Sequence, residues 1–127
     1  NADTWLGGGL KEMNDSTPNT IGAVMVSNCS RYGVLNVNNG IVASFLEKEN
    51  SNRAGLINAG LYHLNPSIFL GFLGGDSFSL ESEVFPVVVS TNMLFALEID
   101  TKFIDIGIPE DYLRFCSWIE LGEKFEC

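Results

Sequence analysis

Two aspartates stand where a carboxylate could bind a metal ion. The segment Phe103–Phe115 reads FIDIGIPEDYLRF, so Asp105 lies at the tip of an apolar strand and a Gly-X-Pro turn follows it. Asp3 lies in the opening segment NADTW. A strand holds its last side chain rigidly while the loop beyond it is open to a ligand. If both carboxylates reach one divalent cation, the expected chemistry is phosphoryl or nucleotidyl transfer. The spacing alone leaves an alternative, because an aspartate near a glycine often only forms a turn.

The elements that must position these aspartates are mostly strands. Runs of small, apolar and β-branched residues predict strands over 20–27, 31–36, 41–47, 55–64, 93–99 and 102–106. Helices are expected after Pro66, from Ser77 or Ser79, and after Pro109, whereas a helix over 5–13 is weakened by three consecutive glycines. This order predicts one α/β domain, a mixed sheet flanked by helices.

Two local signals define the strand connections more closely. Asn39-Gly40 is typical of a type I′ hairpin turn, because both residues accept positive φ. Gly60, inside a strand, indicates a bulge or a close backbone approach.

Composition excludes several classes of protein. The chain has 127 residues, 46% of them apolar, which is enough for one domain with its own core. A net charge of −9 and scattered basic residues argue against a nucleic-acid-binding surface. Three cysteines without a CxxC pattern favour a reducing compartment, so we expect a cytoplasmic protein. No apolar run approaches the ~18 residues of a membrane span, and no signal peptide is evident.

In order along the chain, five segments resemble motifs of the sugar-1-phosphate nucleotidyltransferases. They are NADT (1–4), RYGV (31–34), FLEK (45–48), LINAGLYHL (56–64) and FIDIGIPEDY (103–112). Within that family the resemblance is strongest to bacterial D-glycero-D-manno-heptose 1-phosphate guanylyltransferases; mannose and glucose 1-phosphate enzymes remain alternatives. The resemblance implies a Rossmann-like nucleotidyltransferase fold and a cytoplasmic enzyme that makes nucleotide sugars for surface glycans such as lipopolysaccharide. Its substrates would be a sugar 1-phosphate and a nucleoside triphosphate, with GTP favoured.

The resemblance also implies catalytic roles for three residues. Asp3 and Asp105 match the two aspartates that hold Mg²⁺ (or Mn²⁺) in the family. Lys48 matches the lysine that contacts the sugar phosphate, and its neighbour Glu47 matches a carboxylate that binds hexose hydroxyl groups. Without the resemblance, Glu47-Lys48 would be interpreted as a solvated strand end.

Further substrate-binding residues are implied by two other motifs. Tyr32 and Gly33 lie in the segment that approaches the sugar in the family. Asn58, Gly60 and Tyr62 match the strand that faces the sugar pocket, and their alternate spacing places all three on one face of that strand. The alternative for Tyr62 is simple packing in the core.

Other polar residues have less specific interpretations. His63 points opposite to Tyr62 and is expected to be a surface or hydrogen-bonded core residue rather than a catalyst. Arg31 could contact phosphate or form a turn. Glu110 and Asp111 are expected to stabilise the N-terminus of the last helix rather than bind metal.

The chain departs from the family by lacking its G-G-x-G-T-R-L loop, which cradles the nucleotide phosphates. We therefore expect residues 1–127 to represent the C-terminal portion of a nucleotidyltransferase domain without its N-terminal strands, and to be inactive alone. An exposed sheet edge would favour a homo-oligomer. Two alternatives are a non-catalytic sugar-phosphate-binding or scaffold fragment that needs a partner chain, and an acidic α/β interaction domain.

Overall fold

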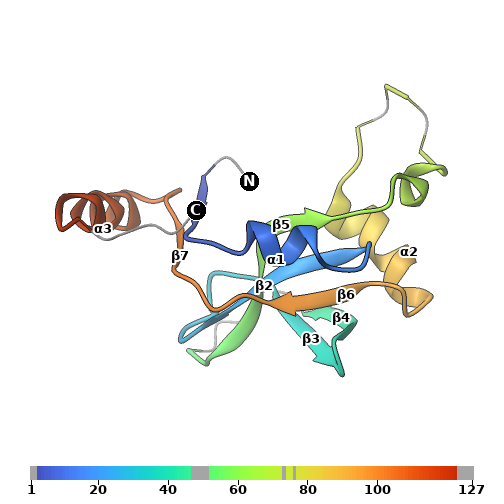
Figure 1. The fold of residues 1–127 in the computed structure, drawn as a ribbon, viewed down its shortest axis with the longest axis horizontal. Helices are drawn as coiled ribbons and strands as arrows, with labels where there is room; N and C mark the ends of the chain where they lie inside the picture. Colours follow the sequence, from blue (N-terminus) through green and yellow to red (C-terminus); the bar gives the residue numbers. More distant parts are fainter. Residues whose placement is uncertain (1–2, 47–51, 73, 76, 123–127) are drawn as a thin grey trace.

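The structure is a computed structural model that describes residues 3–46, 52–72, 74–75 and 77–122. Five strands form a small closed barrel in the order β2-β5-β3-β4-β6 (Figure 1). Their bounds are β2 Thr20–Val26, β3 Val34–Asn38, β4 Ile41–Leu46, β5 Gly55–His63 and β6 Phe95–Glu98. The sheet is mixed, as predicted, because β2 and β6 are parallel while the other pairs are antiparallel. Its closure was not predicted.

The barrel core comes from the apolar runs that predicted the strands. Ile21, Val42, Phe85 and Leu94 are completely buried, and Phe85 reaches this core from outside the sheet. Phe85 begins helix α2 (Phe85–Ser90), which continues from the π-helix η2 (Leu80–Val84). Burying these side chains keeps β2, β4 and α2 together.

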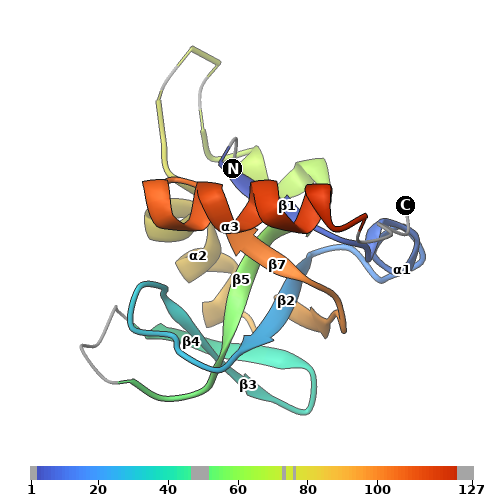
Figure 2. The same ribbon diagram turned by 90° about the vertical axis from the view of Figure 1, so that its left-hand side faces the viewer.

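A second, two-stranded sheet lies beside the barrel. Strand β1 (Thr4–Leu6) pairs antiparallel with β7 (Phe103–Asp105), so that Thr4 lies opposite Asp105. Helix α3 (Pro109–Glu120) follows β7 and lies across this pair in Figure 2. Figure 1 shows α3 at one end of the molecule and α2 at the other, with the barrel between them.

The predicted helix over 5–13 is wrong in its first half. Residues 4–6 form β1, and only Leu10–Asn14 is helical (α1). Gly9 is the reason for the break: it has φ +98°, and a Cβ there would lie 2.6 Å from two side-chain atoms of Ile99. A left-handed, tightly packed position of this kind requires glycine.

The strand predicted over 31–36 begins only at Val34, whereas the predicted turn and helix-start signals are confirmed. Asn39 and Gly40 both have positive φ between β3 and β4, and Gly60 has φ +75° beside a bulge in the β2–β5 pairing. Ser79 caps η2: the Ser82 backbone N–H donates to the Ser79 hydroxyl oxygen. Pro66 begins the short 3-10 helix η1 (Pro66–Phe69). Among the described residues, no helix is long and apolar enough to cross a membrane.

Candidate functional site

The structure brings Asp3 and Asp105 together. The Ile106 backbone N–H donates to the Asp3 carbonyl oxygen at 2.7 Å, which fixes the start of β1 beside the end of β7. A Cβ on Gly107 would lie 3.0 Å from Asp105 Oδ1 and 3.2 Å from Asp3 Oδ2. Both carboxylates therefore face the same small space beside Gly107.

This space fits a hard divalent cation. Its lining offers two carboxylates, and Gly107 keeps it open because any larger residue would place a carbon atom against both. The Gly107 N–H donates to Asp105 Oδ1 at 2.9 Å and orients that carboxylate. No group of three or more His, Cys, Asp or Glu residues that could hold a metal exists in the described part of the chain. Mg²⁺ does not require such a group, since one or two carboxylates commonly hold it together with waters and substrate phosphates.

Tyr32, which precedes Gly33, contacts the strand that carries Asp105. The Tyr32 ring contacts Phe103, the first residue of β7, edge to face, with ring centroids 5.6 Å apart. A Cβ on Gly33 would lie 3.5 Å from the carbonyl oxygen of Leu46, the last residue of β4. The backbone at Gly33 is therefore close to the end of β4. The predicted sugar segment and the predicted metal strand are therefore neighbours.

The charges of Arg31, Asp105 and Asp111 also shift pKa values in this part of the protein. Burial raises the pKa of the Tyr32 hydroxyl, the Arg31 charge opposes that rise, and the Asp105 charge adds to it. The pKa of Arg31 is raised mainly by its hydrogen bond to Asp111, with a further contribution from Asp105. Asp105 is thus close enough to influence both side chains.

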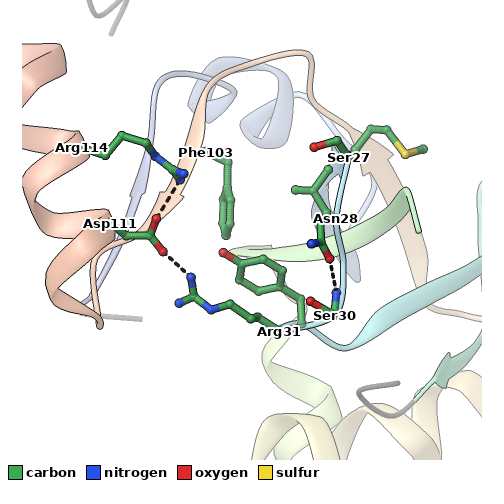
Figure 3. Close-up of a pocket in the computed structure, with 10 residues that line it drawn as sticks. Ser27, Asn28, Ser30, Arg31, Phe103, Asp111 and Arg114 are labelled. Carbon is green, nitrogen blue, oxygen red and sulfur yellow. Dashed lines mark hydrogen bonds and ion pairs between the residues drawn. The ribbon is translucent and has the colours of Figure 1, made fainter. Parts of the chain in front are cut away.

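Asp111 lies in the first turn of α3, as predicted, and its side chain is buried, which the sequence did not indicate. It is 5% exposed and makes ion pairs with Arg31 and with Arg114, whose Nη2 lies 3.0 Å from Asp111 Oδ1. These three side chains line a cavity of about 400 Å³, and Figure 3 shows Phe103 between Arg114 and Asn28. Sequence reasoning missed this arrangement because Arg31 and Asp111 are 80 residues apart in the chain.

Asn58 and Tyr62 lie on one face of β5, as predicted. Asn58 Nδ2 donates to the Tyr62 hydroxyl at 2.9 Å and to Glu81 Oε1 at 3.1 Å, while the Gly60 N–H donates to Asn58 Oδ1 at 2.9 Å. Both amide hydrogens of Asn58 are therefore engaged within the protein, and the Tyr62 hydroxyl keeps its own proton to donate. The Tyr62 ring packs against Phe85, 5.4 Å between centroids, so Tyr62 also contributes to the core.

Two predicted residues, Glu47 and Lys48, lie outside the described residues. His63 is hydrogen-bonded, as expected: its Nδ1 lies 3.1 Å from the Met13 carbonyl oxygen and 3.2 Å from Ser16 Oγ.

Comparison with known proteins gives a consistent result. The family model described as "Nucleotidyl transferase" matches residues 10–120, a range that includes Asp105 and leaves out Asp3. The chain is 37% identical over 101 residues to the mannose-1-phosphate guanylyltransferase catalytic subunit beta of Drosophila melanogaster. It is 40% identical over 96 residues to the probable mannose-1-phosphate guanylyltransferase 2 of Oryza sativa subsp. japonica. These alignments cover 79% and 74% of this chain but only 27% and 26% of the relatives.

Solved structures agree with the sequence comparison. HddC from Yersinia pseudotuberculosis superposes with a TM-score of 0.79 at 33% identity, over 94% of this chain and 53% of HddC. The same protein complexed with GMP-PN gives a TM-score of 0.76 at 31% identity. The chain therefore spans about half of the solved structures that it matches and about a quarter of the curated relatives.

Proposed function

Because this chain belongs to the nucleotidyl transferase family, we propose that it takes part in guanylyl transfer to a sugar 1-phosphate, with heptose or mannose as the sugar. The observation that carries the proposal is the shared space of the Asp3 and Asp105 carboxylates beside Gly107. The curated relatives named above are mannose-1-phosphate guanylyltransferases, and a guanine-nucleotide analogue is bound in one solved relative, which supports GTP as the donor. Such a reaction would belong to cytoplasmic nucleotide-sugar synthesis for surface glycans such as lipopolysaccharide.

In this reaction a phosphate oxygen of the sugar 1-phosphate attacks the α-phosphorus of GTP. The bond from the α-phosphorus to the oxygen that bridges it to the β-phosphorus breaks, and pyrophosphate leaves with that electron pair. A phosphate oxygen is already ionised at neutral pH, so no protein base has to remove a proton from it. The protein contributes position and charge.

Asp3 and Asp105 would hold the divalent cation, Mg²⁺ or Mn²⁺, beside Gly107. The bound cation supplies charge stabilisation to the phosphate oxygens. Lys48 would pair with the sugar phosphate and Glu47 with ring hydroxyl groups, as the family resemblance implies. Tyr32, Gly33, Asn58, Gly60 and Tyr62 would form the wall against the sugar ring. In that wall Tyr62 is suited to donate a hydrogen bond, since its oxygen already accepts one from Asn58.

We propose that residues 1–127 provide the metal and sugar side of the site and do not catalyse the reaction alone, because the family's nucleotide-phosphate loop is absent from them. A second candidate function follows from the same observation: binding of sugar phosphate, without catalysis, in a complex with a partner chain. The β1–β7 pair is joined to no other strand in the described part of the chain, so its edges could support self-association.

Thermal-shift titration tests the proposal, because a ligand that binds only the folded protein raises the melting temperature. Mannose 1-phosphate and heptose 1-phosphate would each be added with Mn²⁺, to the wild-type chain and to Asp105→Asn. Asp100→Asn is the matched control, since Asp100 is an exposed aspartate just before β7. We expect a metal-dependent shift that Asp105→Asn abolishes and Asp100→Asn retains. A shift of equal size in Asp105→Asn, or no shift in the wild type, would contradict the proposal.

A further inference from the structure

Asp111 is unusual because it is a buried charge that lines a cavity. Thr20 and Asp111 are the buried polar side chains in the described part of the chain. Burying a carboxylate is costly unless cationic partners compensate for the lost hydration. An exposed acidic residue would serve the helix dipole equally well, and Glu110, one position earlier, is exposed. The burial of Asp111 therefore needs another explanation.

One partner of Asp111, Arg31, directly precedes the predicted sugar-binding residues Tyr32 and Gly33. Arg31, on the loop after β2, pairs with Asp111 through Nη1, and its guanidinium group lies over the Tyr32 ring at 5.7 Å. The Tyr32 ring in turn contacts Phe103 at the start of β7. The loop is thus attached to α3 through Arg31 and to β7 through Tyr32, and Asp105 lies two residues beyond Phe103.

The Arg31–Asp111 ion pair joins opposite walls of a cavity. The cavity of about 400 Å³ is lined by Asn28, Ser30 and Arg31 from the loop and by Asp111 and Arg114 from α3. Figure 3 shows Asp111 extending from α3 toward Arg31 on the opposite wall. The start of the loop is held to residues 52–55, because the Cys29 N–H donates to the Arg53 carbonyl oxygen at 2.9 Å and Asn28 pairs with Asn52. The Arg31–Asp111 pair and the Tyr32–Phe103 contact attach the following part of the loop to α3 and β7.

We propose that Asp111 is a positioning residue for substrate binding: through Arg31 it holds Tyr32-Gly33 at a fixed distance from the Asp3–Asp105 carboxylate pair. This inference rests on the proposed function, in which Tyr32-Gly33 contacts the sugar and the aspartates hold the cation. Arg31 suits the role because its planar guanidinium group can pair with the carboxylate and lie over an aromatic ring at the same time.

Asp111→Asn tests the proposal, with Glu110→Gln as the matched control on the same helical turn. Isothermal titration measures Mn²⁺ affinity, and then mannose 1-phosphate affinity at saturating Mn²⁺. We expect Mn²⁺ affinity to change less than about twofold in both variants, because Asp3 and Asp105 are intact. Mannose 1-phosphate affinity should fall at least about tenfold in Asp111→Asn and stay unchanged in Glu110→Gln. Equal sugar-phosphate affinity in wild type and a folded Asp111→Asn overturns the proposal.

A measurement without ligand separates this inference from the proposed function. With 3-fluorotyrosine incorporated, the ¹⁹F signal of Tyr32 is assigned by its loss in Tyr32→Phe. We expect Asp111→Asn to shift or broaden that signal and Glu110→Gln to leave it in place. Arg31→Gln serves as a second variant if Asp111→Asn does not fold, since Asp111 keeps Arg114 as its partner. Failure of the wild type to bind mannose 1-phosphate counts against the proposed function, whereas an unmoved Tyr32 signal in either folded variant counts against the positioning role.

Discussion

The barrel and the β1–β7 end of the molecule are held in shape by different interactions. The barrel surrounds completely buried apolar side chains, with Phe85 stacked on Phe45 at 5.8 Å. The β1–β7 pair has three residues in each strand, buries Ile104, and packs Trp5 against Phe115 and Trp118 of α3. The Arg31–Asp111 ion pair joins α3 to the loop after β2. We infer that the barrel supplies most of the folding stability, while the other end supplies the geometry of the proposed metal site. Substitutions in the two regions should therefore affect different measurements.

The largest expected effect on stability is that of Phe85→Ala in the barrel. Removing a completely buried phenylalanine leaves a cavity and should cost about 3–5 kcal/mol in the free energy of unfolding. Urea unfolding measures this, with Val87→Ala on the same helix as the control. Val87 is 63% exposed, and its substitution should change the stability by less than about 0.5 kcal/mol. Equal costs for the two variants would mean that the barrel core does not dominate stability.

A smaller and different effect is expected for Gly107→Ala at the other end. The added methyl group would occupy the space between the Asp3 and Asp105 carboxylates, so Mn²⁺ affinity should fall by about tenfold. Stability should change by less than about 1 kcal/mol, because Gly107 is not among the glycines with positive φ, while the two carboxylates must move to accept the methyl group.

Gly71→Ala is the control for that variant, since nothing lies within 4 Å of a Cβ at position 71. If Gly107→Ala binds Mn²⁺ as tightly as Gly71→Ala does, the space beside Gly107 is not the metal site.

The smallest expected effect is on the pH dependence of stability. It involves one tyrosine from each region, Tyr62 in the barrel and Tyr32 beside β7. Burial raises the pKa of Tyr62 above its ordinary value of 10.0, and the hydrogen bond from Asn58 opposes part of that rise. Burial likewise raises the pKa of Tyr32. The folded protein therefore retains these two protons more strongly than the unfolded chain does. The resulting stabilisation is complete below about pH 10 and is lost as pH rises through the folded-state pKa values.

Unfolding free energies measured between neutral pH and about pH 11 should therefore decline at the alkaline end. Tyr62→Phe and Tyr32→Phe should each make that decline less steep. A decline that is unchanged in Tyr62→Phe would show that this hydroxyl does not gain proton affinity on folding.

The parts of the fold that could be predicted from sequence are those with local causes. Asn39-Gly40 formed its hairpin, Ser79 capped its helix, and Pro109 began α3, because each signal acts within a few residues. The helix predicted from Trp5 failed for two reasons: Gly9 has a left-handed conformation, and residues 4–6 pair with β7, a strand remote in sequence.

The candidate site likewise contains residues that could be predicted from the sequence and a contact that could not. Asp3 and Asp105 were identifiable from motifs, and the structure places both beside Gly107. The burial of Asp111 could not be predicted, since its helix-start position favours an exposed charge and its partner Arg31 lies 80 residues away. Contacts of this range depend on the whole topology rather than on a sequence pattern.

We infer that Asp3 and Asp105 bind one cation together. Electron paramagnetic resonance of Mn²⁺ would measure the affinity of the wild type, Asp3→Asn, Asp105→Asn and the double variant. Each single variant should lose nearly as much affinity as the double variant, because either loss disrupts the same site. Losses that simply add, or an Asp3→Asn variant that binds like the wild type, would contradict this inference.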